Sequence, residues 1–518
     1  MPSSALLSLG PFYTSVLVFS CAAFYFAARR VYIDYKIRKT GGVRARVIAT
    51  NPLWGLPFFV KAGYYQSNNR FLEYFQSLFS SGTPESPNCV EISLTGASRW
   101  LITQEPEHIK TVLTTKFKEY GKGPAFHESW GPFLGDGIFN VDGQLWSNSR
   151  ALLRPIFVRE RVRDIEIFDK WTNALISKLP GSGQTVDVSA LFYRMTLDVT
   201  TDFLLGHGVN SLENPTNQFA QAFHEVQRVQ MILTIMAPFK HFIPKHSYFS
   251  GIRVLNRFID PFVARTLALD PKELDKLSKS DRDSTLLHNI ARYTRDPKMI
   301  RDHLMSVLLA GRDTTAATLS WAIYELANYP AVHGKLRDEV LATVGTSRAP
   351  TYDDLKSMTY LTHTIHEVLR LYPAVPFNIR AALQDTSLPP AEPGQPPIAV
   401  LKDDAIIYSA IAMQRRPELY PEISDKFADP ATFSPDRWNH WTPKPWQYLP
   451  FNGGPRICVG QNFAMTEMAF TLVRLLQRYD RLEYRGDWKA QIYKAEIIGA
   501  PGHGVPVAFF EAACGDDA

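Results

Sequence analysis

One ten-residue segment constrains this chain more than any other feature. Residues 451–460, Phe-Asn-Gly-Gly-Pro-Arg-Ile-Cys-Val-Gly, hold a single cysteine, Cys458, just before an amphipathic stretch that predicts a helix over residues 461–479. A lone cysteine is most often a small buried apolar residue. At a helix N-terminus, however, its thiolate is stabilised by the helix dipole and by backbone N–H groups. The surrounding glycines let the backbone fold tightly around a bulky planar group, and Arg456 supplies a cation for an anionic ligand group.

The spacing of this segment, Phe-x-x-Gly-x-Arg-x-Cys-x-Gly, resembles the haem-binding signature of the cytochrome P450 family at every fixed position. The resemblance implies a haem-thiolate protein with haem b as its cofactor, in which Cys458 is the axial ligand of the iron. It also places Phe451 and Arg456 among the cofactor-binding residues. The implied fold is the cytochrome P450 fold, mainly α with a minor β portion.

A polar run over residues 310–315, Ala-Gly-Arg-Asp-Thr-Thr, interrupts a long apolar pattern that predicts a helix over residues 299–328. Polar residues inside a helix are unfavourable unless they are used, and Gly311 is expected to open space beside the backbone. On the residues alone, a helix kink with satisfied hydroxyls is the alternative. The family carries a similar motif across the distal face of the haem. The resemblance therefore implies that Thr314 hydrogen-bonds dioxygen and water, and that Asp313 helps to relay protons.

Three arginines and one tryptophan are expected to hold the haem carboxylates. Trp146-Ser-Asn-Ser-Arg150 is similar to the family's Trp-x-x-x-Arg, whose two side chains bind a haem propionate. Their i, i+4 spacing places them on one helix face, and a guanidinium fits a carboxylate. Arg380 resembles a further propionate ligand, and Arg456 completes the set.

Glu367 and Arg370 stand three residues apart on another predicted helix. Taken alone, such residues form a solvated ion pair. A downstream hexapeptide, Phe-Ser-Pro-Asp-Arg-Trp, resembles the family segment whose arginine, here Arg437, joins the pair. The three residues are therefore expected to brace the cysteine loop rather than to act in catalysis. His363 and His366 lack an HExxH arrangement, so no metal site is expected there.

The N-terminus predicts a membrane anchor. Residues 5–28 are uncharged and would extend about 36 Å as a helix, against a hydrocarbon core of about 30 Å. A cleaved signal peptide is the alternative, but a positive leader is absent and basic residues follow at once. We therefore expect an anchor over 1–28, a basic collar and Pro-rich linker over 29–58, and one haem-thiolate domain over 59–518. The collar favours a luminal N-terminus and a cytosolic body.

Charge and cysteine usage exclude several classes of protein. The net charge is +5, but residues 29–46 alone carry +6 and the remainder carries −1, so no basic surface for nucleic acid is expected. Four cysteines without a CxxC pair exclude a disulfide framework and a zinc ribbon. Helical periodicity dominates the body, with helices predicted near 145–160, 164–178, 188–205, 215–237, 299–328, 359–371 and 460–478. Short strands are predicted at 90–94, 101–103, 405–409 and 497–510.

Longer stretches, such as YLPFNGGPRICVGQNFAMTE, resemble the fungal n-alkane and fatty-acid hydroxylase group of the family. The resemblance implies an endoplasmic reticulum monooxygenase that hydroxylates a hydrophobic substrate with O2 and with electrons from an NADPH–cytochrome reductase. Tailoring of a fungal secondary metabolite, such as a polyketide, terpenoid or peptide, is an equal alternative. A reductase-independent hydroperoxide isomerase is a remote alternative that the Asp313–Thr314 pair argues against. Ala310 replaces the glutamate that esterifies haem in animal relatives, so no covalent haem link is expected.

The same resemblance indicates which segments face the substrate and which contact the reductase. Mostly apolar segments are expected to face the substrate, although each could equally be core: a predicted loop at 126–139, a helix and loop at 229–242, and stretches at 304–310, 375–377 and 497–498. The second segment could also dock on the membrane surface. A basic cluster follows the predicted propionate ligand, formed by Arg154, Arg159, Arg161 and Arg163. It either binds an acidic face of the reductase or is a solvated helix end.

Overall fold

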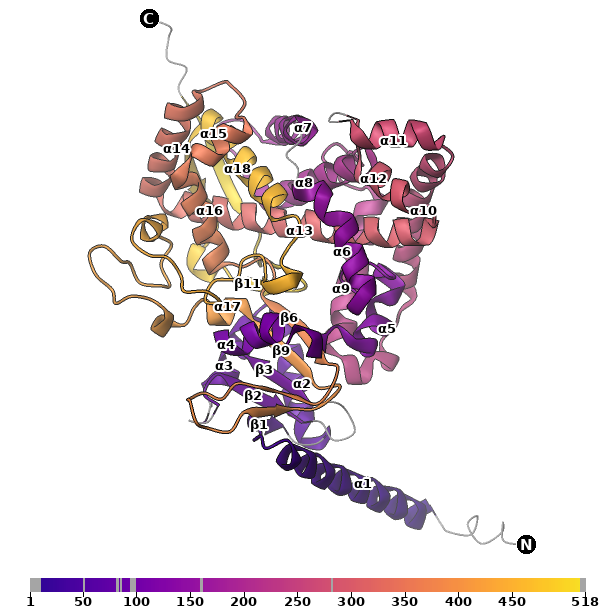
Figure 1. Cartoon of the computed structure of the whole chain (residues 1–518). Helices are drawn as coiled ribbons and strands as arrows, with labels where there is room; N and C mark the ends of the chain where they lie inside the picture. The colour runs from indigo at the N-terminus through magenta and orange to yellow at the C-terminus, as the bar shows by residue number, and fades with distance from the viewer. Residues whose placement is uncertain are drawn as a thin grey trace, which may run out of the picture. The chain divides into compact units, whose positions relative to one another are not determined.

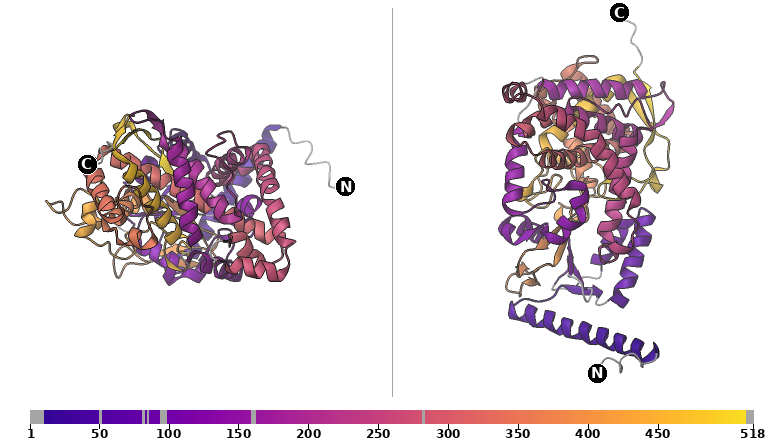
Figure 2. Two further views of the ribbon diagram at one scale, coloured as in Figure 1. Left: turned by 90° about the horizontal axis from the view of Figure 1, so that it is seen from above. Right: turned by 90° about the vertical axis from the view of Figure 1, so that its right-hand side faces the viewer.

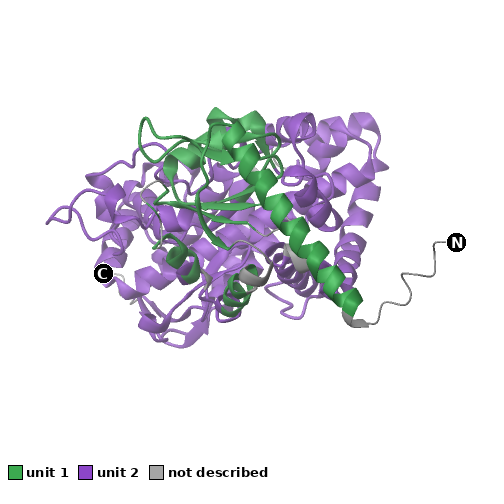
Figure 3. Cartoon of the chain, turned by 90° about the horizontal axis from the view of Figure 1, so that it is seen from below, with its two compact units in different colours: residues 1–64, 74–121, 379–408 green, residues 65–73, 122–378, 409–518 purple. Residues whose placement is uncertain are grey.

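The computed structural model of the chain describes residues 11–49, 52–80, 83, 86–93, 99–158, 162–280 and 283–512. They group into two compact units, drawn in green and purple in Figure 3. Unit 1 comprises residues 1–64, 74–121 and 379–408, and unit 2 comprises residues 65–73, 122–378 and 409–518. The two units are described one at a time.

Unit 1 is built on a six-stranded sheet with the strand order β1-β2-β3-β9-β6-β4. The middle of the sheet combines an antiparallel β2–β3 pair with a parallel β3–β9 pair, in which Leu101 lies opposite Ile406. Both residues are fully buried in the core of the unit, as is Cys89. The strands are β1 (Arg46–Ala49), β2 (Cys89–Ile92), β3 (Trp100–Thr103), β4 (Tyr120–Gly121), β6 (Phe377–Ala382) and β9 (Ala405–Ser409), with a β7 (Thr386–Leu388)–β8 (Ile398–Val400) hairpin beside them.

The N-terminal helix α1 (Pro11–Lys39) is a single uninterrupted helix, seen in indigo in Figure 2. It is long and apolar enough to span a membrane, with a mean hydropathy of 1.5 over its most apolar 18 residues. The helix also continues into the basic collar, as far as Lys39. At that end Ile33 and Ile37 are buried against Ala399 and Leu401. The first part of the collar is therefore helical and packed within unit 1.

Most of unit 2 is helical, which confirms the predicted mainly α fold with a minor β portion. Helix α13 (Pro297–Asn328) is buried along most of its length and contacts α8, α10, α16 and α18 (Figure 1). Asp296 caps its first turn by accepting a hydrogen bond from the Lys298 N–H. The other main helices are α5 (Gly123–Leu134), α6 (Gly143–Val158), α7 (Val162–Lys178), α8 (Val188–Leu205), α9 (Gln218–Ile235), α10 (His246–Leu267), α11 (Pro271–Lys279), α12 (Leu286–Tyr293), α14 (Pro330–Val344), α15 (Tyr352–Ser357), α16 (Thr359–Leu371) and α18 (Gln461–Arg478).

Two segments predicted as irregular are helical. The predicted loop over residues 126–139 is largely α5, because Pro124 fits the first turn of a helix and Gly135, with a φ of 50°, ends it. Likewise, Pro52 begins helix α2 (Pro52–Ser67) where a stiff linker is predicted. In both segments proline and glycine favour a loop by composition, but they stand at positions that are compatible with the ends of a helix.

The late strand over residues 497–510 is interrupted. It divides into β12 (Gly499–Pro501) and β13 (Pro506–Glu511), because the backbone turns at Gly504, whose φ is 66°. β12 pairs with β11 (Tyr493–Ala495), whereas β13 lies between β10 (Tyr479–Tyr484) and β5 (Thr185–Asp187).

Candidate active site

The cysteine loop precedes α18, and its backbone is fixed by local hydrogen bonds. The Cys458 N–H donates to the Phe451 carbonyl at 2.9 Å, and the Asn452 side chain donates to the Arg456 carbonyl at 3.3 Å. Asn452 and Gly454 adopt positive φ angles of 64° and 65°. The Cys458 side chain remains exposed at the end of this tight loop.

Competing effects act on the thiol of Cys458. Burial of its surroundings raises the pKa of the thiol, whereas the Gly460 N–H and the positive charge of Arg150 lower that pKa. The Gly460 N–H and the Arg150 charge therefore favour the thiolate, in the direction predicted for a cysteine at a helix N-terminus. A cation bound to sulfur would act in the same direction, because a coordinating thiol loses its proton.

Trp146 and Arg150 lie on one face of α6, as their spacing predicts, and Arg456 lies beside the same indole ring. The Arg150 guanidinium donates to the Ile457 carbonyl at 2.8 Å, directly beside Cys458. The guanidinium carbons of Arg150 and Arg456 lie 5.9 and 4.8 Å from the centre of the Trp146 ring. One indole therefore orients two cations beside the cysteine loop. Arg380 is buried on β6 and belongs to unit 1, so its role toward the haem stays a prediction.

The polar run of α13 is ordered by specific contacts, and the helix is continuous from Pro297 to Asn328. The Thr314 hydroxyl donates to the Ala310 carbonyl at 2.7 Å. The Asp313 carboxylate is buried and pairs with Arg312 at 3.2 Å. Burial raises the pKa of Asp313, while Arg312 and a hydrogen bond from Gln227 of α9 oppose the shift.

The space that Gly311 was predicted to open is filled by α8. A Cβ atom at position 311 would lie 2.8 Å from the hydroxyl oxygen and 3.0 Å from the methyl carbon of Thr200. Glycine is thus required here because two buried helices approach closely. The glycine that was expected to open space beside the backbone instead sets the close packing of α13 on α8.

Gly311→Ala is expected to lower the free energy of unfolding by about 1–3 kcal/mol, the usual cost of overpacking a core. Thr200 cannot turn aside readily, because β-branched side chains are stiff inside helices. Gly334→Ala is the matched control: position 334 lies inside α14 with nothing within 4 Å of an added Cβ, so alanine should be neutral or stabilising there. Denaturant unfolding measures both variants, and Thr200→Ala should relieve the first. An unaltered midpoint in Gly311→Ala would contradict the packing argument.

Glu367, Arg370 and Arg437 form the predicted network. Arg370 donates to both carboxylate oxygens of Glu367 at 2.8 Å, and Arg437 donates to one of them at 2.8 Å. All three side chains are fully buried. His366 accompanies them and lies 2.8 Å from the Tyr448 hydroxyl. Within the described residues no cluster of three or more histidine, cysteine and acidic side chains is arranged to hold a metal ion.

A model of the cytochrome P450 family matches residues 53–501. The chain belongs to the cytochrome P450 family. It is 45% identical to cytochrome P450 monooxygenase pvhE of Talaromyces variabilis, covering 96% of this chain and 95% of that protein. It is 37% identical to cytochrome P450 52E1 of Candida apicola, covering 86% of this chain and 87% of that protein. The crystal structure of the cytochrome P450DA heme domain shares the fold, with a TM-score of 0.73 and 21% identity over 91% of this chain and 98% of that one.

The residues around Cys458 fit the haem that cytochromes P450 carry on a cysteine thiolate. The test is the chemistry of the donor set. The loop presents one exposed thiol, which suits iron, and two neighbouring guanidinium groups, which suit carboxylates. Arg456 already binds a carboxylate in this structure, because its Nη2 atom lies 2.6 Å from Asp142. The family model and the relatives show that the chain is a cytochrome P450 monooxygenase, and the residues of the cysteine loop fit the haem of that family.

Glu467 of α18 is a buried acid that the sequence analysis missed. Its side chain is 1% exposed, and within the described part of the chain its Oε1 atom has no hydrogen-bond partner. Thr315 of α13 hydrogen-bonds the carboxyl group, and burial raises the pKa of Glu467 to about 8. The sequence does indicate this residue, because Glu467 is an acidic side chain at an apolar position of the amphipathic pattern that predicts α18.

Replacing Glu467 by glutamine should remove a pH dependence of stability. The unfolded carboxyl ionises near pH 4.5, whereas the folded one stays protonated up to about pH 8. Its contribution to stability is therefore complete below pH 4.5 and is lost as the pH rises to about 8. Glu467→Gln should melt like the wild type at pH 5 and at a higher temperature at pH 8. A melting-temperature difference that does not widen with pH would contradict this assignment.

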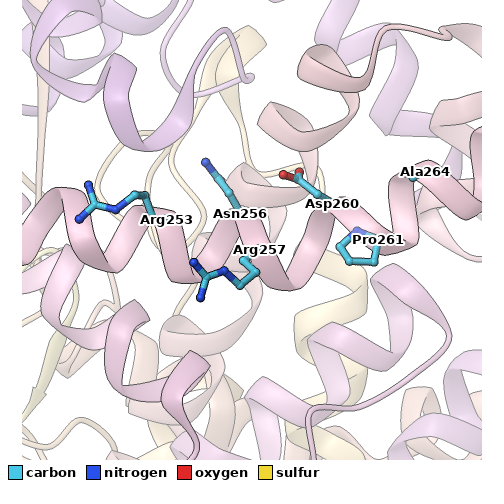
Figure 4. A pocket seen from close by; sticks show the side chains of 6 residues that line it. All are labelled: Arg253, Asn256, Arg257, Asp260, Pro261 and Ala264. Atoms are coloured by element: carbon cyan, nitrogen blue, oxygen red, sulfur yellow. The ribbon is translucent and has the colours of Figure 1, made fainter.

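Two surface features do not join the site. A groove of about 610 Å³ runs along α10, and all of its lining side chains come from that one helix, as Figure 4 shows for Arg253 and Asp260. It is an open surface groove rather than a ligand cavity. Of the basic residues considered for reductase docking, Arg154 is exposed on α6. Arg159 and Arg161 lie outside the described residues, as does the side chain of Arg163, so the docking idea stays a prediction.

Proposed function

We propose that this cytochrome P450 hydroxylates a long-chain alkane, a fatty acid or a similar lipid-like molecule at the endoplasmic reticulum membrane. Electrons come from an NADPH–cytochrome reductase in the same membrane, and the body faces the cytosol because the collar after the anchor is basic. The observation that carries the proposal is that the exposed Cys458 thiol precedes α18, and that α18 contacts α13, the helix that holds Asp313 and Thr314.

The protein residues have distinct roles in this proposal. Bound haem b would supply oxygen activation: substrate C–H, dioxygen, two electrons and two protons give C–OH and water. Cys458 would hold the iron, while Arg150, Arg456 and Arg380 would hold the haem carboxylates. Asp313 would accept protons from the side of α9 and pass them toward the hydroxyl of Thr314.

Apolar side chains support a hydrophobic substrate. Phe126 and Trp130 of α5 stack with their ring centres 5.3 Å apart. Leu233 of α9 and Leu304 of α13 belong to the same hydrophobic core of unit 2, and Ile497 packs against it. Binding of a long apolar chain in such surroundings would be stabilised by about 25 cal/mol for each Å² of apolar surface buried. Which of these residues touch the substrate stays a prediction.

The substrate class is tested with membranes containing the full chain, reductase and NADPH. Terminally hydroxylated products from alkanes or fatty acids would support the proposal. Turnover of polyketides, terpenoids or peptides with none of the lipids would favour the secondary-metabolite alternative. Product formed from a hydroperoxide without NADPH would instead favour an isomerase.

Thr314→Ala is expected to uncouple the reaction. NADPH oxidation should continue while product per NADPH falls at least fivefold, because a positioned proton donor contributes a factor of about 10²–10⁴ to such steps. Thr315→Ala is the neighbouring control, since the Thr315 side chain hydrogen-bonds Glu467 of α18. It should keep the wild-type ratio even where it lowers stability. Equal product yields in Thr314→Ala and the wild type would remove Thr314 from the proton relay.

A further inference from the structure

One carboxylate, that of Asp142, contacts two functional segments of unit 2. Its Oδ1 atom accepts a hydrogen bond from Nη2 of Arg456 at 2.6 Å. The same carboxylate accepts the backbone N–H groups of Lys122 and Gly123, each at 2.8 Å. Arg456 belongs to the cysteine loop, and Lys122 and Gly123 begin α5. The family motifs used in the sequence analysis assign no role to Asp142.

The Arg456 guanidinium is held in a fixed position. Its Nη2 atom also donates to the Val141 carbonyl at 2.9 Å, and its planar group lies over Trp146, 4.8 Å from the ring centre. Its side chain is 8% exposed, against 26% for Asp142. A guanidinium has five N–H donors in a rigid fork. Pairing with Asp142 is therefore compatible with binding a second carboxylate, and it reduces the side-chain freedom lost when that carboxylate binds.

The first turn of α5 depends on Asp142. The N-cap residue, Lys122, makes no capping hydrogen bond with its own side chain. Asp142 instead supplies a negative charge at the helix N-terminus, where exposed N–H groups and the helix dipole favour it. Gly123 is buried with a φ of 76°, so the chain enters the helix through a conformation that suits glycine. At the opposite end of α5, Asp302 of α13 accepts the N–H of Asp136 at 2.8 Å.

We propose that Asp142 is a positioning residue that couples α5, on the substrate side, to the cysteine loop by holding Arg456 and the first turn of α5 with one carboxylate. The proposal rests on the proposed function, because it takes Arg456 to bind a haem carboxylate. A substitution that frees Arg456 should then increase the mobility of the first turn of α5, and one that frees this turn should weaken the hold of Arg456 on haem. Retention of haem and rigidity of α5 would share this single contact.

The test uses the full-length holoenzyme and the variants Asp142→Asn, Arg456→Gln and their double variant. Haem transfer to apomyoglobin reports retention, and hydrogen exchange in the peptide over residues 122–134 reports the rigidity of α5. Each single variant should speed haem transfer at least fivefold and raise exchange in the first turn of α5. The double variant should transfer haem no more than about twice as fast as the faster single variant, because both remove one shared interaction.

Asp198→Asn is the matched control. Asp198 also accepts two backbone N–H groups, those of Ser211 and Leu212, at 2.8 and 3.0 Å. The Asp198→Asn variant should have a lower melting temperature than the wild type, and its haem transfer should be no faster. If Asp142→Asn behaves in the same way, or if the effects of the single variants multiply in the double variant, the coupling is refuted. A wild type that lacks a thiolate-type spectrum would refute the proposed function itself.

A variant that keeps the charge covers the case in which Asp142→Asn yields no folded protein. Asp142→Glu retains the negative charge but displaces it by one methylene. Exchange in the first turn of α5 should rise, while haem transfer stays slower than in Arg456→Gln, because Arg456 keeps its carboxylate partner. Haem transfer as fast as in Arg456→Gln, or unchanged α5 exchange, would overturn the proposal.

Discussion

Cys458→Ala is expected to abolish the thiolate-type absorption of the reduced, carbon monoxide-bound enzyme, together with all monooxygenase turnover. The reason is chemical: the loop offers one exposed sulfur, and thiolate ligation gives cytochromes P450 their electron-donating axial ligand. The absorption spectrum and the haem content are measured on the same preparation, so that loss of the ligand is distinguished from loss of the cofactor.

Cys89→Ala is the matched control for this experiment. Cys89 is fully buried in the core of unit 1, where burial raises the pKa of its thiol far above the usual range. The control should keep the thiolate-type spectrum, at the cost of a small cavity. A thiolate-type spectrum that persists in Cys458→Ala would require another ligand and would refute the assignment.

Glu367→Ala is expected to destabilise the enzyme by about 3–5 kcal/mol, enough to prevent folding of many domains. The substitution leaves the guanidinium groups of Arg370 and Arg437 buried without their shared carboxylate. It also removes the acceptor of the Ser434 N–H and of the Trp438 indole N–H, at 3.0 Å each. Thermal melting and the yield of haem protein measure the effect.

Glu418→Ala is the control for an exposed pair. Glu418 binds Arg416 at 2.7 Å, but its side chain is 60% exposed, and such pairs contribute about 1 kcal/mol or less. A similar loss of stability in both variants would show that burial of the Glu367 network has no special importance. The loss of stability in Glu367→Gln should lie between those of the two alanine variants, because glutamine keeps the shape of the side chain but loses its charge.

The cysteine loop was predictable because its chemistry is local. Spacing alone brought Phe451, Arg456 and Cys458 together, and the i, i+4 rule placed Trp146 and Arg150 on one helix face. The predicted helix over residues 359–371 coincides with α16, since its apolar residues repeat with a helical period. Patterns of this kind need no knowledge of what lies opposite.

The remaining features depend on partners that are distant in sequence. Gly311 is explained only by Thr200, and the chain gives no signal that α8 approaches there. Asp142 begins α6 in sequence, yet its carboxylate serves α5 and Arg456. Helix α10 was missed because Gly251 and Pro261 interrupt its pattern, and its stability comes from packing on neighbouring helices.

Helix α1, which is long and apolar enough to span a membrane, is continuous with a packed structure, and this has a mechanical consequence. After α1 ends at Lys39, Val43 at once exchanges backbone hydrogen bonds of 2.9 Å with Pro397 and Ala399 at the edge of the β7–β8 hairpin. Lys36 pairs with Asp385 at 2.8 Å one turn earlier. These contacts fix the end of α1 against unit 1. If α1 spans a bilayer whose thickness sets its tilt, we expect the sheet of unit 1 to tilt with it.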